Sequence, residues 1–141
     1  MVRKTKYLKI RDKSEDLIYD KINVITYGTF NLFHFGHARL LKRAAKLGEK
    51  LIIGLSTDGF NKKKGKQSVQ TYQQRKEVLE MLGCVDMVIP EKSWNQKARD
   101  MALFRARMCM GSDWKGKFDE YGCIYLPRTR GISSTKLKET L

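Results

Sequence analysis

The chain has 141 residues, and its 29 Lys or Arg against 15 Asp or Glu give a formal net charge of +14 at pH 7. This length predicts one domain with a sizeable core, and no second catalytic domain is expected. The charge indicates an anionic partner, a requirement that a nucleotide, a phosphorylated metabolite, a nucleic acid or a membrane surface would each satisfy.

Two features of the composition indicate the compartment. No apolar run approaches the roughly 20 residues of a membrane span, and no apolar run of a signal peptide follows the charged N-terminus. Cys84, Cys109 and Cys123 are odd in number and lack CxxC spacing, which argues against a disulfide framework or a zinc site. We therefore expect a soluble protein of the reducing cytoplasm, without membrane insertion.

Residues 1–21 carry seven Lys or Arg and four Asp or Glu, with only weak apolar points. This composition predicts a loosely held, basic N-terminal extension with room for one short helix. A solvated arm or partner contact is the favoured interpretation, and a role in phosphate binding is the alternative. The extension would precede a domain at residues 22–141.

Residues 23–48 (NVITYGTFNLFHFGHARLLKRAAKLG) are predicted to form a strand, a glycine turn and a helix. The stretch is β-branched and aromatic up to Gly28, and from Ala38 the apolar residues recur at helical spacing until a second glycine. The chain has two histidines, His34 and His37, and both belong to this stretch. Their spacing of three residues at the first turn of the helix predicts that they share one face.

The first turn of a helix has backbone N–H groups without intrahelical partners, so it attracts anions. His34 and His37 would add two imidazoles to such an anion site. Metal ligation is not expected, because two histidines alone lack the third and fourth protein ligands that zinc takes. The alternative is that each histidine is a satisfied structural residue.

Residues 51–56 (LIIGLS) are a continuous apolar run, typical of a parallel strand that is buried on both faces. The polar segment 57–68 is predicted to be a loop, and its length and its lysines indicate a functional lid, with a solvated charge run as the alternative. Thr71 has capping-box spacing to Gln74 and is predicted to open a helix, before a third strand at 85–89. The apolar residues of that helix expected to face inward are Val78, Leu79, Met81 and Leu82.

The last part of the chain continues the alternation of helices and strands. A helix is expected at about 93–104 after another capping-box spacing, and short strands are expected at 107–110 and 123–126. A polar loop at 111–116 lies between these two strands, and 128–135 leads into a last helix. Strands that alternate with helices predict an α/β fold, with a five-stranded parallel sheet and helices on both faces.

Trp94 and Trp114 each follow a predicted strand. Tryptophan is highly buried on average, so we expect both to be packing residues rather than platforms for a nucleotide base. For Trp114, which follows Asp113 in a polar loop, the second interpretation stays open.

Parallel strands end at the same edge of a sheet, where ligands of α/β proteins bind. The loops predicted at this edge hold the two histidines, the lysine cluster, Asp113 and residues 128–135. Gly28 would let the backbone approach a ligand, and two helix starts would present N–H groups to phosphates. Lys64, Lys66 and Arg128 would neutralise charge, so the assembly suits several phosphates together, as in a nucleoside triphosphate. Neither a Walker loop nor a GxGxxG motif is present.

The segment from Gly28 to His37, GTFNLFHFGH, resembles the GTFDxxHxGH motif of the HxGH nucleotidyltransferase superfamily. Residues 22–140 further resemble the glycerol-3-phosphate cytidylyltransferase family. The matching segments are 26–28, 56–58, 60–61, 75–76, 88–92, 116–119, 125–129 and 131–133. The resemblance implies the Rossmann-like HxGH fold, a homodimer, and transfer of CMP from CTP to sn-glycerol 3-phosphate, with Mg²⁺ carried by the triphosphate.

The resemblance also implies the site residues. The positions that match CTP contacts are Thr29, Phe30, His34, Phe35, Gly36, His37, Lys66, Arg128, Thr129, Arg130, Gly131, Ile132, Ser133, Ser134 and Thr135. The positions that match the acceptor site are Lys64 and Lys97, with Arg75 and Asp113 in the same region. His34, His37, Lys64 and Arg128 are expected to be catalytic. A phosphate monoester is already ionised near pH 7, so these residues need only position and stabilise charge.

Four positions depart from the family pattern. Asn31 replaces an Asp, Ser112 replaces the first Asp of Gly-Asp-Asp-Trp, Gly83 stands where Arg is common, and Arg130 replaces a Glu. Each change removes negative charge or alters a basic position, so affinity, metal dependence or acceptor choice is expected to respond. Asn31 is the most consequential, because a carboxylate there would orient a neighbouring Arg or Lys.

The sequence therefore predicts a cytidylyltransferase that makes CDP-glycerol for a cell-envelope or capsule polymer. One alternative is the same chemistry on another alcohol phosphate, such as ribitol, ethanolamine or choline phosphate. The other is a homologue without activity that binds a nucleic acid or another anionic polymer, which the charge of +14 would favour.

Overall fold

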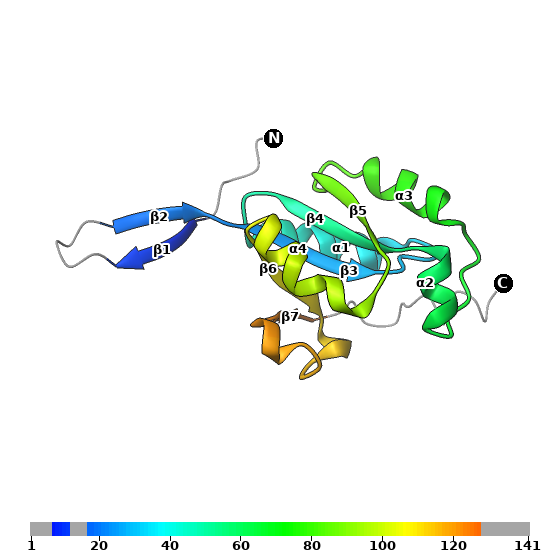
Figure 1. The fold of residues 1–141 in the computed structure, drawn as a ribbon. Coiled ribbons are helices and arrows are strands. Elements are labelled where there is room, and N and C mark those ends of the chain that lie inside the picture. The colour runs from blue at the N-terminus through cyan, green and yellow to red at the C-terminus, as the bar shows by residue number, and fades with distance from the viewer. Residues whose placement is uncertain (1–6, 12–16, 128–141) are drawn as a thin grey trace.

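The computed structural model describes residues 7–11 and 17–127, which form an α/β fold (Figure 1). Its main sheet, in this described part, has five parallel strands in the order β5-β4-β3-β6-β7. The strands are β3 (Asn23–Gly28), β4 (Leu51–Ser56), β5 (Met87–Glu91), β6 (Ala106–Gly111) and β7 (Ile124–Leu126). The predicted five-stranded parallel sheet is thus confirmed.

The helices cover both faces of this sheet, as predicted. They are α1 (Phe35–Ala45), α2 (Asp58–Lys63), α3 (Tyr72–Glu80) and α4 (Lys97–Leu103), with short 3₁₀ turns η1 (Trp94–Gln96), η2 (Ser112–Trp114) and η3 (Asp119–Tyr121). Figure 1 shows α4 in front of the sheet and α1 behind it. No helix in the described ranges is long and apolar enough to cross a membrane.

The period of two along the strands divides the core into two clusters. In β3, Val24 packs with Leu41 of α1 and Leu79 of α3 on one face. Ile25 and Tyr27 belong to the cluster on the other face, beside α4 and η3. All of β4 is buried, as its unbroken apolar run predicts. The helices packed on the two faces hold the strands in place, and the loops that follow the strands meet at the C-terminal edge of the sheet.

The predicted loop at 57–68 is wrong in its first half, because α2 begins at Asp58. Thr57 caps this helix, since its Oγ1 accepts a 3.1 Å hydrogen bond from the backbone N–H of Phe60. Phe60 and Asn61 turn into the core. The short helix was not predicted because the lysines dominate the composition of this segment.

The helix predicted after Thr71 is confirmed as α3, with Thr71 Oγ1 accepting from the backbone N–H of Gln74. Leu79 is fully buried, as expected. Met81 is 83% exposed, so the prediction that it faces inward is wrong. It is the C-cap residue of α3, where the helical periodicity that would turn it inward has ended.

Two segments of the N-terminal extension, for which the sequence allowed at most a short helix, form strands. β1 (Tyr7–Arg11) pairs antiparallel with β2 (Leu17–Lys21) in a two-stranded sheet of its own. The predictions for residues 128–135 and for the last helix lie outside the described residues.

Gly54 in β4 lies where the core leaves no space for a side chain. A Cβ there would be 2.3 Å from Cδ1 and 2.5 Å from Cε1 of Tyr27. The Tyr27 ring cannot move away easily, because it is buried and its hydroxyl donates a 2.9 Å hydrogen bond to Asp100. Gly54→Ala is therefore expected to lower the free energy of unfolding by about 1 to 3 kcal/mol, measured by urea denaturation.

Gly59→Ala is the matched control for this prediction. Gly59 lies in α2, and a Cβ there would meet nothing within 4 Å. Its stability should be unchanged or slightly raised, since Ala is the better helix former. Equal losses in the two variants would contradict the steric argument.

Candidate active site

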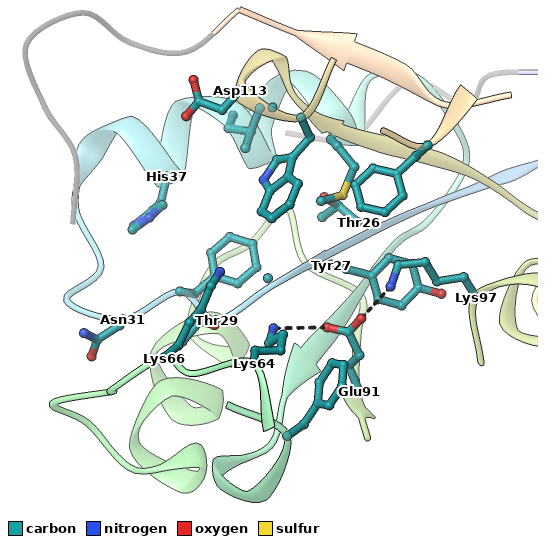
Figure 2. A pocket seen from close by; sticks show the side chains of 18 of the residues that line it. Thr26, Tyr27, Thr29, Asn31, His37, Lys64, Lys66, Glu91, Lys97 and Asp113 are labelled. Atoms are coloured by element: carbon teal, nitrogen blue, oxygen red, sulfur yellow. Dashed lines mark hydrogen bonds and ion pairs between the residues drawn. The ribbon is translucent and has the colours of Figure 1, made fainter. Parts of the chain in front are cut away.

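A cavity of about 800 Å³ opens at the C-terminal edge of the main sheet. It lies where β3 continues to β4 on one side and meets β6 on the other, which is the switch point where α/β sheets bind ligands. Figure 2 shows Lys64, Glu91 and Lys97 at one side of the cavity and His37 and Asp113 at the other. The predicted meeting of these loops is confirmed for the described residues.

The turn between β3 and α1 brings the backbone to the cavity. A Cβ at Gly28 would lie 2.9 Å from Cε2 of Phe30, so the close turn requires glycine. Phe30 and Leu32 have φ angles of 50° and 51°, in the left-handed region that such residues rarely adopt. The buried Phe30 ring meets His37 edge-on, with ring centroids 5.5 Å apart.

His34 and His37 form the N-terminal cap of α1. The backbone N–H of Gly36 donates to His34 Nδ1 at 3.1 Å, and the backbone N–H of His34 donates to His37 Nδ1 at 3.2 Å. Because both Nδ1 atoms accept, each neutral ring carries its proton on Nε2. The rings stack with centroids 3.8 Å apart, so the two histidines share one face at the start of the helix, as predicted, and both line the cavity.

Burial keeps both imidazoles neutral. It lowers the pKa of His37 from 6.5 to about 4, with a further contribution from the adjacent His34. Burial also lowers the pKa of His34. His34 Nε2 is buried and has no hydrogen-bond partner in the part of the chain that the structure describes. The pair is therefore suited to donate hydrogen bonds to an anion rather than to attract it by charge.

A buried carboxylate joins the two lysines of the predicted acceptor site. Glu91 Oε2 accepts a 2.8 Å hydrogen bond from Lys97 Nζ, and Glu91 Oε1 lies 4.0 Å from Lys64 Nζ (Figure 2). Glu91 is 3% exposed and Lys97 is 5% exposed. Burial lowers the pKa of Lys64 from 10.5 to about 8, opposed by Glu91 and reinforced by the positive charges of Lys66, Lys97 and Arg75.

Aromatic rings surround the cationic side of the cavity. Lys66 Nζ lies 5.4 Å from the ring centroid of Trp114, and Trp94 packs edge-on against Phe60 at 4.9 Å. Trp94 is 55% exposed and Trp114 is 39% exposed, and both line the cavity. Neither is a core residue, but the prediction that they are packing residues is confirmed, because Trp94 packs on Phe60 and Trp114 on Phe118, with the centroids of the second pair 5.7 Å apart.

Asn31 is buried beneath the turn and binds the segment 68–70. Its Oδ1 accepts from Ser68 Oγ at 3.2 Å and from the backbone N–H groups of Val69 and Gln70 at 3.1 and 3.2 Å. An amide oxygen accepts these bonds without bringing a buried negative charge. Asn31 thus ties the histidine turn to the loop that precedes α3.

Arg75 does not line the cavity, although it was predicted to be near the acceptor. Its side chain is buried and donates to the backbone oxygens of Thr29, Ser56 and Gln70 at 2.9, 2.7 and 3.2 Å, and to Asp58 Oδ1 at 2.7 Å. The hydrogen bond from the backbone N–H of Tyr72 lowers the pKa of the Asp58 carboxyl, and the Arg75 guanidinium lowers it further. Arg75 therefore holds loops together beneath the site.

The structure brings to one cavity most of the predicted site residues that it describes. Those that line it are Thr29, Phe30, His34, Gly36, His37, Lys64, Lys66, Lys97 and Asp113. Phe35 does not line it; the ring is 55% exposed and lies beneath the guanidinium of Arg39. Residues 128–135 lie outside the described part of the chain.

Among the described residues that line the cavity, Glu91 is the charged one that sequence reasoning missed. Its signal was a single acid after Pro90 at the end of a predicted parallel strand, the level at which ligand-binding groups occur. Without the fold, nothing distinguished it from a solvated glutamate.

Three features define a nucleotidyltransferase of the HxGH class. They are a glycine turn after the first parallel strand, two histidines that cap the next helix, and a lysine-rich wall on the opposite side of the cavity. The model of the cytidylyltransferase-like family matches residues 25–140. The chain therefore belongs to the cytidylyltransferase-like family.

The curated relatives agree with this membership. Glycerol-3-phosphate cytidylyltransferase of Bacillus spizizenii is 54% identical over 123 residues, covering 84% of this chain and 95% of the relative. The proteins of the same name from Staphylococcus aureus and Bacillus subtilis are 51% and 50% identical, covering 84% of this chain and 93% and 95% of their own lengths.

A solved structure supports the fold. The lipopolysaccharide core biosynthesis protein of Thermoplasma volcanium superposes with a TM-score of 0.65 at 21% identity, covering 77% of this chain and 98% of its own. At this identity the likeness concerns the fold alone.

The buried His37 makes stability depend on pH. Its pKa of about 4 in the folded protein lies below the ordinary value of 6.5, so the unfolded chain takes up the proton first as the pH falls. Between these two pH values the fold is expected to lose about 3 kcal/mol of unfolding free energy through this group. Urea denaturation across this range measures the loss.

His37→Asn is the control for the pH dependence. Asn places an acceptor near the position of Nδ1 but does not titrate, so the variant should lose less stability over the same range. A pH dependence identical to that of the wild type would contradict the assignment to His37.

Proposed function

We propose that this protein transfers CMP from CTP to glycerol 3-phosphate and releases CDP-glycerol and pyrophosphate. The observation that carries the proposal is the pairing of two neutral imidazole donors with two lysines across one cavity. The relatives named glycerol-3-phosphate cytidylyltransferase support the choice of both substrates.

The two sides of the cavity suit the two substrates, the acceptor phosphate and CTP. Lys64 and Lys97 would hold the incoming phosphate, whose ionised oxygen attacks the α-phosphorus of CTP in line. The bond from the α-phosphorus to the bridging oxygen breaks, and pyrophosphate departs. His34 and His37 would donate their Nε2 protons in hydrogen bonds to phosphate oxygens as charge develops, and neither acts as a base.

The remaining triphosphate contacts are proposed from the sequence. Lys66 lies at the rim beside Trp114, where a cation could neutralise the departing phosphates. Arg128 and residues 129–135 would complete this side with a guanidinium, hydroxyls and a helix start.

Mg²⁺ would enter this site with the triphosphate. The described residues contain no cluster of three or more His, Cys, Asp or Glu, so they form no metal cage. Mg²⁺ ordinarily takes one or two carboxylates together with substrate phosphates and water. Asp113, whose side chain is exposed on the cavity lining, would supply such a carboxylate. Bound there, the ion would neutralise charge on the triphosphate.

The lysines also disfavour a cationic acceptor. Lys97 Nζ lies 4.8 and 5.5 Å from the ring centroids of Tyr27 and Phe118, and Lys64 Nζ lies 4.7 Å from that of Phe60. Such ring faces would otherwise bind the ammonium group of choline or ethanolamine phosphate. Because the lysines already cover them, we expect phosphates of uncharged polyols, which carry no ammonium group, to be the better acceptors.

A turnover assay tests the proposal. Pyrophosphate release is measured for each of the four nucleoside triphosphates with glycerol 3-phosphate, ribitol 5-phosphate, choline phosphate and ethanolamine phosphate. CTP with glycerol 3-phosphate should be the fastest pair. Activity with ribitol 5-phosphate and none with glycerol 3-phosphate would overturn the choice of acceptor. RNA binding that weakens steeply with salt, without CTP turnover, would instead favour the nucleic-acid-binding alternative.

The histidine assignment predicts a specific kinetic defect. His37→Asn retains an acceptor for the helix cap but lacks the Nε2 donor, so kcat should fall on the order of 10² or more while CTP binding changes little. Steady-state kinetics together with calorimetric CTP titration measure the two effects. Lys42→Ala, an exposed change on the same helix, should retain wild-type kcat. An unchanged kcat with weaker CTP binding in His37→Asn would refute the role.

We further propose the division of the chain into a basic extension at 1–21 and a catalytic domain at 22–141. The family match at residues 25–140 supports the second part. The homodimer and the cytoplasmic location implied by the resemblance stay predictions, and sedimentation analysis would test the first of them.

A further inference from the structure

We propose that Glu91 is the positioning residue of the acceptor site. Its carboxylate holds the ammonium groups of Lys64 and Lys97 together, and thereby sets the pH range in which the site binds a phosphate dianion. This inference rests on the proposed function, because it assigns to Glu91 the arrangement of the lysines that would receive glycerol 3-phosphate.

The position of Glu91 allows each of its oxygens to serve a different lysine. Glu91 is the last residue of β5, while Lys97 begins α4 and Lys64 is the C-cap residue of α2. Oε2 bonds to Lys97 Nζ and Oε1 faces Lys64 Nζ (Figure 2). One carboxylate thus contacts lysines that belong to two different helices, α2 and α4.

The two contacts differ in strength. The Lys97 contact is short, at 2.8 Å, and both partners are buried, so removal of either would leave an uncompensated charge. The Lys64 contact is long, at 4.0 Å, and that side chain is 16% exposed. Lys97 is therefore the fixed member of the pair, and Lys64 is the member able to turn toward an incoming phosphate.

The charges around Lys64 make Glu91 decisive for its protonation. Burial is the largest influence and favours the neutral amine. Lys66, Lys97 and Arg75 act in the same direction, and among the charged groups that face Lys64 in the described part of the chain, Glu91 alone favours the ammonium form. Lys64 is charged below its pKa of about 8, so loss of the Glu91 charge would move its deprotonation to lower pH.

Glu91→Gln in the full chain tests this inference by enzyme kinetics. The substitution keeps the shape of the side chain and removes its charge. The alkaline limb of kcat/KM for glycerol 3-phosphate should move down by about one pH unit or more. At pH 8 the KM for glycerol 3-phosphate should rise about fivefold or more, and the KM for CTP should change less than about twofold. An alkaline limb at the wild-type pH would overturn the proposal.

A second measurement does not depend on turnover. In protein labelled with [¹³Cε]lysine, the Lys64 resonance is assigned by its loss in Lys64→Arg and followed against pH. The titration midpoint should lie near pH 8 in the wild type and lower in Glu91→Gln. The same midpoint in both proteins would overturn the inference. A shifted midpoint in a protein that does not turn over CTP would support it while refuting the proposed function.

Asp100→Asn is the matched control. Asp100 is 4% exposed and accepts 2.9 Å hydrogen bonds from Tyr27 and Gln96 rather than from a lysine. Its loss should lower stability and leave the alkaline limb in place. A limb that moves equally in both variants would show that any buried acid here has this effect, and would overturn the specific role of Glu91.

Discussion

The hydrogen bonds of one buried guanidinium support the site as a whole. Arg75, whose side chain is 0% exposed, donates to the backbone oxygens of Thr29 and Ser56, which follow β3 and end β4. It also binds Gln70 and the carboxylate of Asp58, and so joins the start of α3 to both strand ends. A buried guanidinium is tolerated only when its donors are satisfied, so these loops have little freedom to separate. The hydrogen bonds of Arg75 therefore hold the loops beneath the cavity in fixed positions.

Burial has different effects on the protonation of the histidines and of Lys64 in the cavity. Burial disfavours the charged form of every titratable group. For the stacked imidazoles the result is a neutral ring with a directed donor, since the backbone N–H groups occupy both Nδ1 atoms. For Lys64 the same burial is partly offset by Glu91, so that the ammonium form persists at neutral pH. The site can therefore hold directional donors on one wall and full positive charges on the other, which suits the stages of a phosphate transfer.

The sequence was sufficient to predict the parts of the protein that repeat a local pattern. The apolar run of β4, the cap of α3 and the shared face of His34 and His37 each follow from spacing alone. Two of the missed features depend on contacts between different elements of the fold. Arg75 was predicted near the ligand, because the sequence does not show the backbone carbonyl oxygens that its guanidinium binds. The role of Glu91 depends on lysines of other elements, whose proximity the sequence does not show. The short helix α2 was hidden because its lysines are solvated and its inward face is only Phe60 and Asn61.

The left-handed residues in the histidine turn bear on how this site can be moved or altered. Phe30 and Leu32 each hold a backbone conformation that costs roughly 1 kcal/mol or more in an isolated chain. Bonds from outside the turn maintain it, including the one from the Leu32 backbone N–H to Gln70 Oε1 at 3.0 Å. The ten-residue motif is thus not a self-contained module. A graft of it onto another strand and helix would relax unless the segment around residue 70 and a buried arginine were transplanted with it.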